Sequence, residues 1–246
     1  MSKKEEDEPA PSQRRSFFPA PPSHAPAEKG MNRFVWNMRY PDAKRVPGAI
    51  LWMGSLSGPV AIPGKYQVRL TVGDKVMTHM WEWKKDPRLE TTQADFQKQF
   101  DLLIEIRDKV TEINTAIIKL RNVRAQIDDL AAKIKGHPQA EQVIEAGEGL
   151  KAKLKTIEDV LIQSKSKSGQ DPLNYPILLD NKIAAMAAVV ASADARPTDQ
   201  SYEVFEYFSG LADVELDKLK SVLEQDLPEF NDLCRRLEIP AVILKK

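Results

Sequence analysis

The chain has 246 residues, 42% of them hydrophobic, and its 36 basic residues are balanced by 36 acidic ones. This balance argues against a nucleic-acid-binding protein, because phosphate recognition needs a net basic surface. The sequence contains no apolar run of about 18 residues, so it predicts no membrane span. The single cysteine, Cys234, excludes an internal disulfide and a zinc site built from cysteines.

Residues 1–29 are highly charged at first and then rich in proline. Such a segment has little apolar surface to bury, and proline lacks a backbone donor, so we expect a disordered or polyproline-like arm. Phe17 and Phe18 within it could anchor a partner. The first eight residues lack the apolar core of a secretory signal.

Residues 30–88 carry the pattern of an antiparallel β unit. Four segments are strand candidates by their alternation or their short apolar runs, namely residues 33–39, 49–53, 66–72 and 77–83. Gly73-Asp74 between the last two predicts a two-residue hairpin turn, because glycine accepts a positive φ. In that hairpin Tyr66, Val68, Leu70 and Val72 share one face, and so do Met77, His79, Trp81 and Trp83.

Four strands are too few for an immunoglobulin-like sandwich, which needs about seven to cover both inner faces. The sequence therefore predicts a partial immunoglobulin-like unit. Either the missing strands belong to a partner or to an upstream segment, or the sheet rests on the helices that follow.

Residues 89–246 are predicted to be helical. Thr92 and Asp95 form a capping-box pattern at the start of a long helix that ends at Gly136-His137-Pro138, where we expect a left-handed glycine cap. A second helix is predicted over 139–166. The inward-facing residues expected on these two helices are Phe96, Phe100, Leu103, Val110, Ile113, Ile117, Leu120, Ile127, Leu130, Ile134, Val143, Leu150, Leu154, Ile157, Val160 and Leu161.

A third helix is predicted over 176–193, and a fourth from Thr198 to about Leu237, with a bend or break at Pro228. The expected core face of the fourth helix consists of Val204, Phe208, Leu211, Val214, Leu219, Val222, Leu223 and Phe230. Four helices with short connections indicate an antiparallel four-helix bundle. The predicted fold class is α+β, with an arm (1–29), a β domain (30–88) and a helical domain (89–246).

No catalytic, metal or cofactor site is predicted. His24, His79 and His137 lie in three different segments and show no metal-ligand spacing. The loop 54–58 has no lysine and no following helix, so it does not fit a phosphate-binding loop. The carboxylates, including Asp101, Glu105, Asp108, Glu112 and the pairs 128–129 and 158–159, are interpreted as solvated helix faces.

The tryptophans Trp36, Trp52, Trp81 and Trp83 all lie in the β region. Exposed aromatic rings on a β domain can stack against sugar rings, but we favour a core role, because large aromatic side chains dominate core area. Trp52 fits the alternation least well and is the candidate ligand-contact residue.

Four stretches of this sequence together resemble the C-terminal region of bacterial sortilin-like, BNR-repeat "glycosyl hydrolase" family proteins. They are GMNRFVWNMRYPDA at 30–43, GPVAIPGKYQVRLTV at 58–72, DPR at 86–88 and ASADARPTDQSY at 191–202. In that family a β-propeller precedes an immunoglobulin-like module and a helical tail. The resemblance implies that residues 32–36 and 63–70 belong to the second half of that module.

This chain has no propeller and no Asp-box repeat, so any hydrolase activity that the family's name implies would belong to the absent propeller. We expect a non-catalytic interaction module from the C-terminal part of a larger, secreted-type protein; the resemblance implies a secreted or periplasmic location, which the sequence itself does not indicate. Its expected partner is a β-propeller polypeptide, or another copy of the chain through an open strand edge. The alternative is a carbohydrate-binding accessory module that contacts a polysaccharide.

Overall fold

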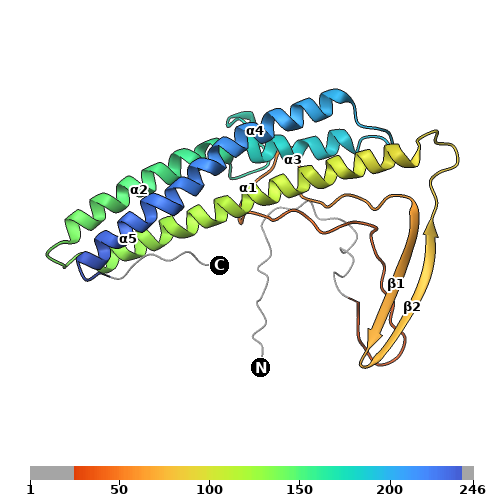
Figure 1. Ribbon diagram of the computed structural model, residues 1–246, viewed down its shortest axis with the longest axis horizontal. Helices are drawn as coiled ribbons and strands as arrows, with labels where there is room; N and C mark the ends of the chain where they lie inside the picture. Colours follow the sequence, from red (N-terminus) through yellow and green to blue (C-terminus); the bar gives the residue numbers. More distant parts are fainter. Residues whose placement is uncertain (1–24, 240–246) are drawn as a thin grey trace. The chain divides into compact units, whose positions relative to one another are not determined.

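The computed structural model describes residues 25–239, which contain the helices and strands of an α+β protein (Figure 1). The chain divides into two compact units, Met1–Arg39 and Tyr40–Lys246. Of the first unit the structure describes residues 25–39, so the arm predicted over 1–29 lies almost entirely outside the described residues. No helix within residues 25–239 is long and apolar enough to cross a membrane.

Residues 25–39 contain no β-strand, and the strand predicted over 33–39 is therefore wrong. The Asn32 side chain instead accepts a hydrogen bond from the Glu28 N–H and donates one to the Glu28 carbonyl, both at 2.9 Å. Such local side-chain bonds offer the backbone an alternative to a strand ladder. The Trp36 indole N–H donates to the Arg39 carbonyl at 3.2 Å, which is also a local bond.

The two other β segments form the predicted hairpin. β1 (Gly64–Val72) pairs antiparallel with β2 (Lys75–Trp83), and Gly73 in the connecting turn has a φ of 56°. A positive φ is accessible to glycine without a steric penalty, which explains its place in this two-residue turn. The described residues thus contain a two-stranded sheet where four strands were expected.

The first helix, α1 (Gln93–Lys133), is 41 residues long, about 60 Å at 1.5 Å per residue. Its predicted capping box is confirmed, because the Thr92 hydroxyl accepts from the Asp95 N–H and the Asp95 carboxylate accepts from the Thr92 N–H. The helix ends close to the predicted position. Gly136, however, is not left-handed, and the His137 N–H instead bonds the Ile134 carbonyl at 2.8 Å.

Three further helical segments follow α1 (Figure 1). They are α2 (Ala140–Leu161), α3 (Leu179–Val190) and the pair α4 (Asp199–Ser221) and α5 (Leu227–Arg236). The helices α2, α3 and α4 lie against α1, and α5 lies against α2. A single 3-10 turn, η1 (Asp171–Leu173), precedes α3. The π-helical turn η2 (Val222–Asp226) joins α4 to α5, and Pro228 lies in the first turn of α5, so the helix is irregular before Pro228 but is not broken at it.

The second and third helices follow one another along α1. α2 contacts the C-terminal part of α1 through the ion pair of Glu158 with Arg121, whereas Gln99, near the start of α1, donates to the Val190 carbonyl at the end of α3. The α4–α5 pair extends beside both, since Asp213 binds Lys109 of α1 and Asp226 binds Lys153 of α2. The four-helix bundle is accordingly not confirmed, because α2 and α3 share one side of α1 in succession.

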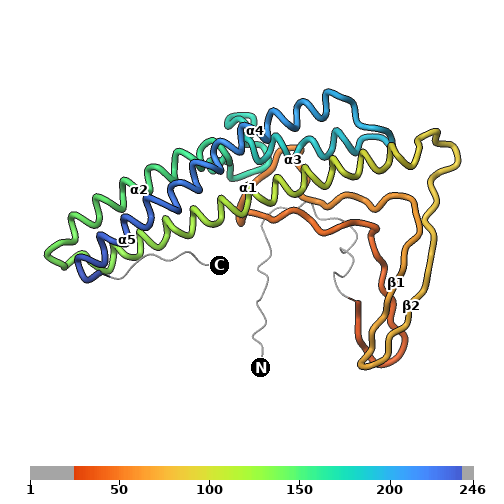
Figure 2. The backbone as a smooth tube through the Cα atoms, in the orientation of Figure 1, coloured from red at the N-terminus to blue at the C-terminus, as the bar shows by residue number. Residues whose placement is uncertain are grey.

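The connecting segment, residues 40–62, is a loop that runs beside α1, in orange in Figure 2. Its Lys44 carbonyl accepts from the Asn114 amide at 2.6 Å, and Val46 is buried in the helical core. The strand predicted over 49–53 is wrong. The N–H and C=O of Trp52 are both bonded to the Asn181 side chain of α3, so they are not engaged in a ladder.

The core consists mainly of the predicted faces of α1 and α2, but the predicted face of α4 is partly wrong. Val204, Leu211 and Val214 are exposed, while Phe205 and Ala212 take the buried positions. On α2, Val160 is exposed as well. Apolar residues occupy more than one face of α4, and spacing alone does not tell which face the rest of the molecule covers.

Candidate interaction surface

The β1–β2 hairpin has one mainly apolar face, as its sequence predicts, and one mixed face on which polar residues of β1 lie opposite two apolar residues of β2, Val76 and Met80. The register places Tyr66 opposite Trp81, Val68 opposite His79 and Leu70 opposite Met77, so these residues share one face. The other face carries Lys65, Gln67, Arg69 and Thr71 on β1, opposite Glu82, Met80, Thr78 and Val76 on β2. We call the first of these the apolar hairpin face; it consists of Tyr66, Val68, Leu70, Val72, Met77, His79, Trp81 and Trp83.

Much of this face is open to solvent. Val68, Leu70, Val72 and Met77 are each at least half exposed. Among the described residues, neither strand packs against a helix. The alternative in which the sheet rests on the helices is therefore wrong for the described part of the chain. A two-stranded hairpin is marginally stable by itself in water, and a contiguous exposed apolar patch is typical of an interaction site.

Aromatic side chains stabilise the end of the hairpin nearest residues 63 and 84. The Tyr66 and Trp81 rings stack with centroids 5.2 Å apart, and the Tyr66 hydroxyl donates to the Ile62 carbonyl. Burial is the main cause that raises the pKa of Tyr66. Aromatic cross-strand pairs stabilise a hairpin, so the register is fixed at this end.

The core role expected for the tryptophans is wrong. Trp36 is 39% exposed, and Trp52, Trp81 and Trp83 are only half-buried, so none belongs to the buried core. Trp52, the candidate ligand-contact residue, lies in the connecting segment. Its N–H donates to Asn181 Oδ1 at 2.6 Å, and its carbonyl accepts from Asn181 Nδ2 at 2.8 Å. These bonds hold Trp52 firmly against α3.

The other candidate residues are not brought together. Phe17, Phe18 and His24 lie outside the described residues. His79 lies on the hairpin and His137 lies beyond the end of α1, and both are exposed. Within residues 25–239, no three His, Cys, Asp or Glu side chains are grouped so that they could hold a metal ion. Cys234 is buried in α5, where burial raises the pKa of its thiol.

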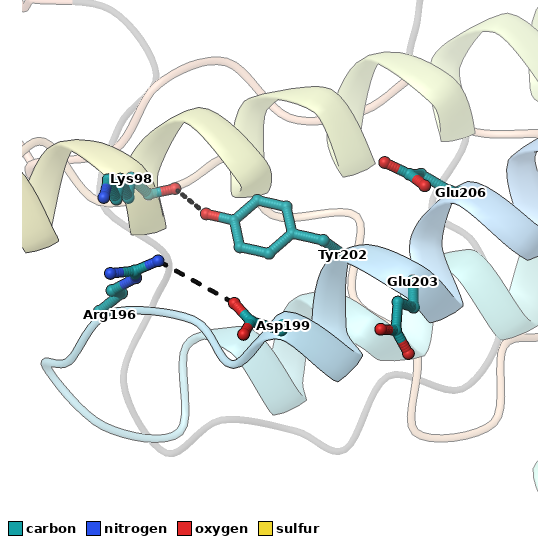
Figure 3. Close-up of a pocket in the computed structure, with 6 residues that line it drawn as sticks. All are labelled: Lys98, Arg196, Asp199, Tyr202, Glu203 and Glu206. Carbon is teal, nitrogen blue, oxygen red and sulfur yellow. Dashed lines mark hydrogen bonds and ion pairs between the residues drawn. The ribbon is translucent and has the colours of Figure 1, made fainter.

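A pocket of about 420 Å³ lies at the start of α4, and its lining is mostly charged (Figure 3). Arg196 approaches Asp199 at 3.9 Å, and the Tyr202 hydroxyl approaches the Lys98 carbonyl at 3.5 Å. Glu203 and Glu206 complete the lining from α4. No group in the pocket is a nucleophile paired with a base, so this arrangement suits recognition of charge rather than catalysis.

Sequence reasoning missed three buried carboxyl groups, those of Glu158, Asp180 and Glu215, of which the first two are the most deeply buried. Glu158, interpreted as a surface residue, is 3% exposed and binds Arg121 at 2.7 Å as well as Arg124. Asp180 is also 3% exposed, and burial raises its pKa to about 7, against the lowering effects of the Asn181 N–H and the Arg121 charge. Arg124 interrupts the apolar stripe of α1, which is the one sequence signal for a buried acidic partner.

Glu158 and Asp180 are buried among the helices α1 to α5, which we call the helical layer, and neither lines the described pocket. Both carboxyl groups therefore have structural roles. The exposed carboxylates Asp101, Glu105, Asp108 and Glu112 lie on the solvated face of α1, as predicted.

No protein-family model, curated protein or solved structure matches this chain.

Proposed function

We propose that this chain is a non-catalytic interaction module whose hairpin binds the strands of a partner polypeptide. The single observation that carries the proposal is the apolar hairpin face, which is at least half exposed at Val68, Leu70, Val72 and Met77 and is not covered by a described helix. The strand edges of β1 and β2 add backbone donors and acceptors that another strand can pair with.

The helical layer supports this role by holding the connecting segment in place. Asn181 of α3 fixes Trp52, and Asn114 of α1 fixes Lys44, so the chain that leads to β1 is attached to rigid helices. The hairpin would then complete a partial immunoglobulin-like unit with strands from outside. The sequence resemblance suggests a β-propeller polypeptide as the partner, with any hydrolase activity in that propeller.

A carbohydrate-binding module is the second candidate, and the fixed, half-buried Trp52 favours it. An indole ring held on a rigid backbone can stack against a sugar ring with little loss of conformational entropy. Tryptophan fluorescence that changes on titration with a polysaccharide, and no longer changes in Trp52→Ala, would favour this candidate.

The experiment for the proposed function is light scattering on the size-exclusion eluate of the full chain at several concentrations. Without its partner, the wild-type chain is expected to self-associate as concentration rises, because association covers the apolar hairpin face. The double variant Leu70→Thr/Met77→Thr keeps strand-favouring residues but removes apolar surface, and it is expected to stay monomeric. Arg69→Thr, on the other face of the hairpin, is the matched control and should associate like wild type.

Hydrogen exchange on the associated form separates two modes of contact. Strand addition slows exchange of the outward-facing amides of β1 or β2, whereas packing of side chains alone does not. A wild-type chain that is a compact monomer at all concentrations contradicts the proposed function. So does association that persists unchanged in Leu70→Thr/Met77→Thr.

A further inference from the structure

The helix α4 exposes a second apolar surface, separate from the hairpin. Val204, Tyr207, Leu211 and Val214 are between 41% and 63% exposed, and we call them the α4 stripe. Their spacing of three, four and three residues is that of the a and d positions of a heptad, so they line up on one side of the helix. A different side of α4, with Phe205, Ala212 and Leu219, is buried in the core.

A surface helix of a monomeric domain ordinarily carries one apolar stripe and a polar opposite face. On α4 both faces are apolar, although only one is covered within the described residues. The stripe follows a single helix over three turns, and another helix with apolar residues at the same period would interdigitate with it. The geometry therefore favours a helix as the occupant, rather than a strand or an extended peptide.

The charge beside the stripe indicates which kind of helix. Glu203, Glu206, Asp213 and Asp217 flank it on one side, all exposed. Asp213 is bound by Lys109 at 2.7 Å, but Glu203, Glu206 and Asp217 form no ion pair with any residue in the described range 25–239. Burial is the main cause that raises the pKa of Tyr202; Arg196 is the largest electrostatic influence and lowers it, while Glu105, Asp101 and Asp199 raise it. The acidic character of this surface therefore rests on the exposed carboxylates of Glu203, Glu206 and Asp217.

We propose that the α4 stripe and its acidic flank bind a basic amphipathic helix of a partner protein. Apolar side chains of that helix pack on Tyr207 and Leu211, while its Lys or Arg side chains meet Glu203, Glu206 and Asp217. The charged pocket of Figure 3, which Glu203 and Glu206 line, lies at the end of the stripe where such a basic side chain can enter. Complementary charge of this kind sets specificity and the association rate.

A second copy of this chain is a poorer occupant. In an antiparallel twofold pairing of two α4 helices, the acidic flank of one copy faces the acidic flank of the other. Like charges opposed across an interface disfavour the complex. A helix that carries basic residues at these positions replaces that repulsion with attraction.

The test uses a fluorescent synthetic peptide of about 21 residues, with Leu at positions a and d and Lys beside them, and measures its anisotropy against the full chain. The chain carries Leu70→Thr/Met77→Thr throughout, so that the hairpin does not interfere. We expect saturable binding that weakens with salt. Leu211→Asp should weaken it at least about tenfold, because it places a charge in the apolar contact. Val160→Asp, at a similarly exposed valine of α2, is the matched control and should bind like the parent.

Two further variants make the result decisive. Tyr207→Ser removes apolar area without adding charge and should also weaken binding, with an unchanged circular dichroism spectrum. Glu203→Gln/Glu206→Gln should weaken binding several-fold and reduce its salt dependence. The proposal is overturned if the peptide binds Leu211→Asp and the parent equally, or if a peptide with Glu in place of Lys binds as tightly. Dimerisation of the parent that Leu211→Asp abolishes would also overturn it, in favour of a second copy.

Discussion

Burial of the Asp180 carboxyl group lowers the stability of the folded chain at neutral pH. It is 3% exposed, and its pKa of about 7 lies above that of an unfolded aspartate, about 3.9. Between these values the folded chain retains a proton that the unfolded chain has lost. The free energy of unfolding therefore falls as pH rises from about 4 to about 7, and the loss is complete above that range.

We predict that Asp180→Asn is more stable than wild type at pH 8, and that this advantage shrinks at pH 5. Asparagine keeps the oxygen that accepts from the Asn181 N–H, but it does not ionise. Since one pKa unit corresponds to about 1.4 kcal/mol, the advantage should grow by roughly 2–3 kcal/mol between pH 5 and pH 8. Urea denaturation at both pH values measures it.

The control for this experiment is Asp159→Asn, at a solvent-exposed aspartate of α2 that pairs with Lys155. An exposed ion pair contributes little to stability, so the difference from wild type should stay small at both pH values. An advantage of Asp180→Asn that is the same at pH 5 and pH 8 would show that Asp180 is ionised throughout this range.

At the scale of the element, the two glycines of α2 have opposite surroundings. A methyl group at Gly149 would meet no atom within 4 Å, whereas at Gly147 it would come within 2.8 Å of Ile127 Cγ2 on α1 and 3.5 Å of Phe230 on α5. Gly147 thus lets three helices approach closely. The sequence shows only that both glycines lower the helix propensity of α2.

We predict that Gly149→Ala raises the free energy of unfolding by about 0.5–1 kcal/mol, because alanine is the better helix former. Gly147→Ala should lower it by about 1–3 kcal/mol, since the new methyl group overpacks the contact between α1 and α2 and this cost outweighs the gain in propensity. Denaturant unfolding of the two variants beside wild type measures both. Equal stabilisation by the two substitutions would mean that α2 does not pack on Ile127 as described.

The sequence predicts an element correctly where the interactions that form it are local in the chain. The Thr92–Asp95 capping box, the Gly73-Asp74 turn and the alternation of β1 and β2 all act within a few residues, and each is confirmed. The strand expected over 33–39 depended on a neighbouring strand, and local bonds such as that of Asn32 formed instead. A strand needs a partner for its ladder, which its own sequence does not specify.

The same distinction applies to the candidate sites. The apolar hairpin face follows from alternation and was predicted residue by residue. The exposure of Val204, Leu211 and Val214 was not, because α4 has apolar residues on two faces and only packing on α1 and α3 decides which is buried. The burial of Glu158 likewise depends on Arg121 and Arg124, which are 37 and 34 residues away in the chain.

At the scale of the whole molecule, the hairpin and the helical layer should be thermodynamically independent. Their described connections are the ends of the connecting segment and single bonds such as that of Gln93 Nε2 to the Pro63 carbonyl at 2.9 Å. Neither strand packs against a described helix, whereas Val46 of the connecting segment is 1% exposed within the helical core. Units that share few buried contacts unfold separately.

We predict that replacing residues 65–82 by a short Gly/Ser linker shifts the thermal midpoint of the helices by less than about 4 °C, the equivalent of roughly 1 kcal/mol for a chain of this size. Circular dichroism at a helix-sensitive wavelength follows the transition. Val46→Asp, which places a charge in the helical core, is the positive control and should lower the midpoint far more. If the hairpin deletion lowers it as much as Val46→Asp does, the apolar hairpin face is covered by the chain's own residues and is not free to receive a partner.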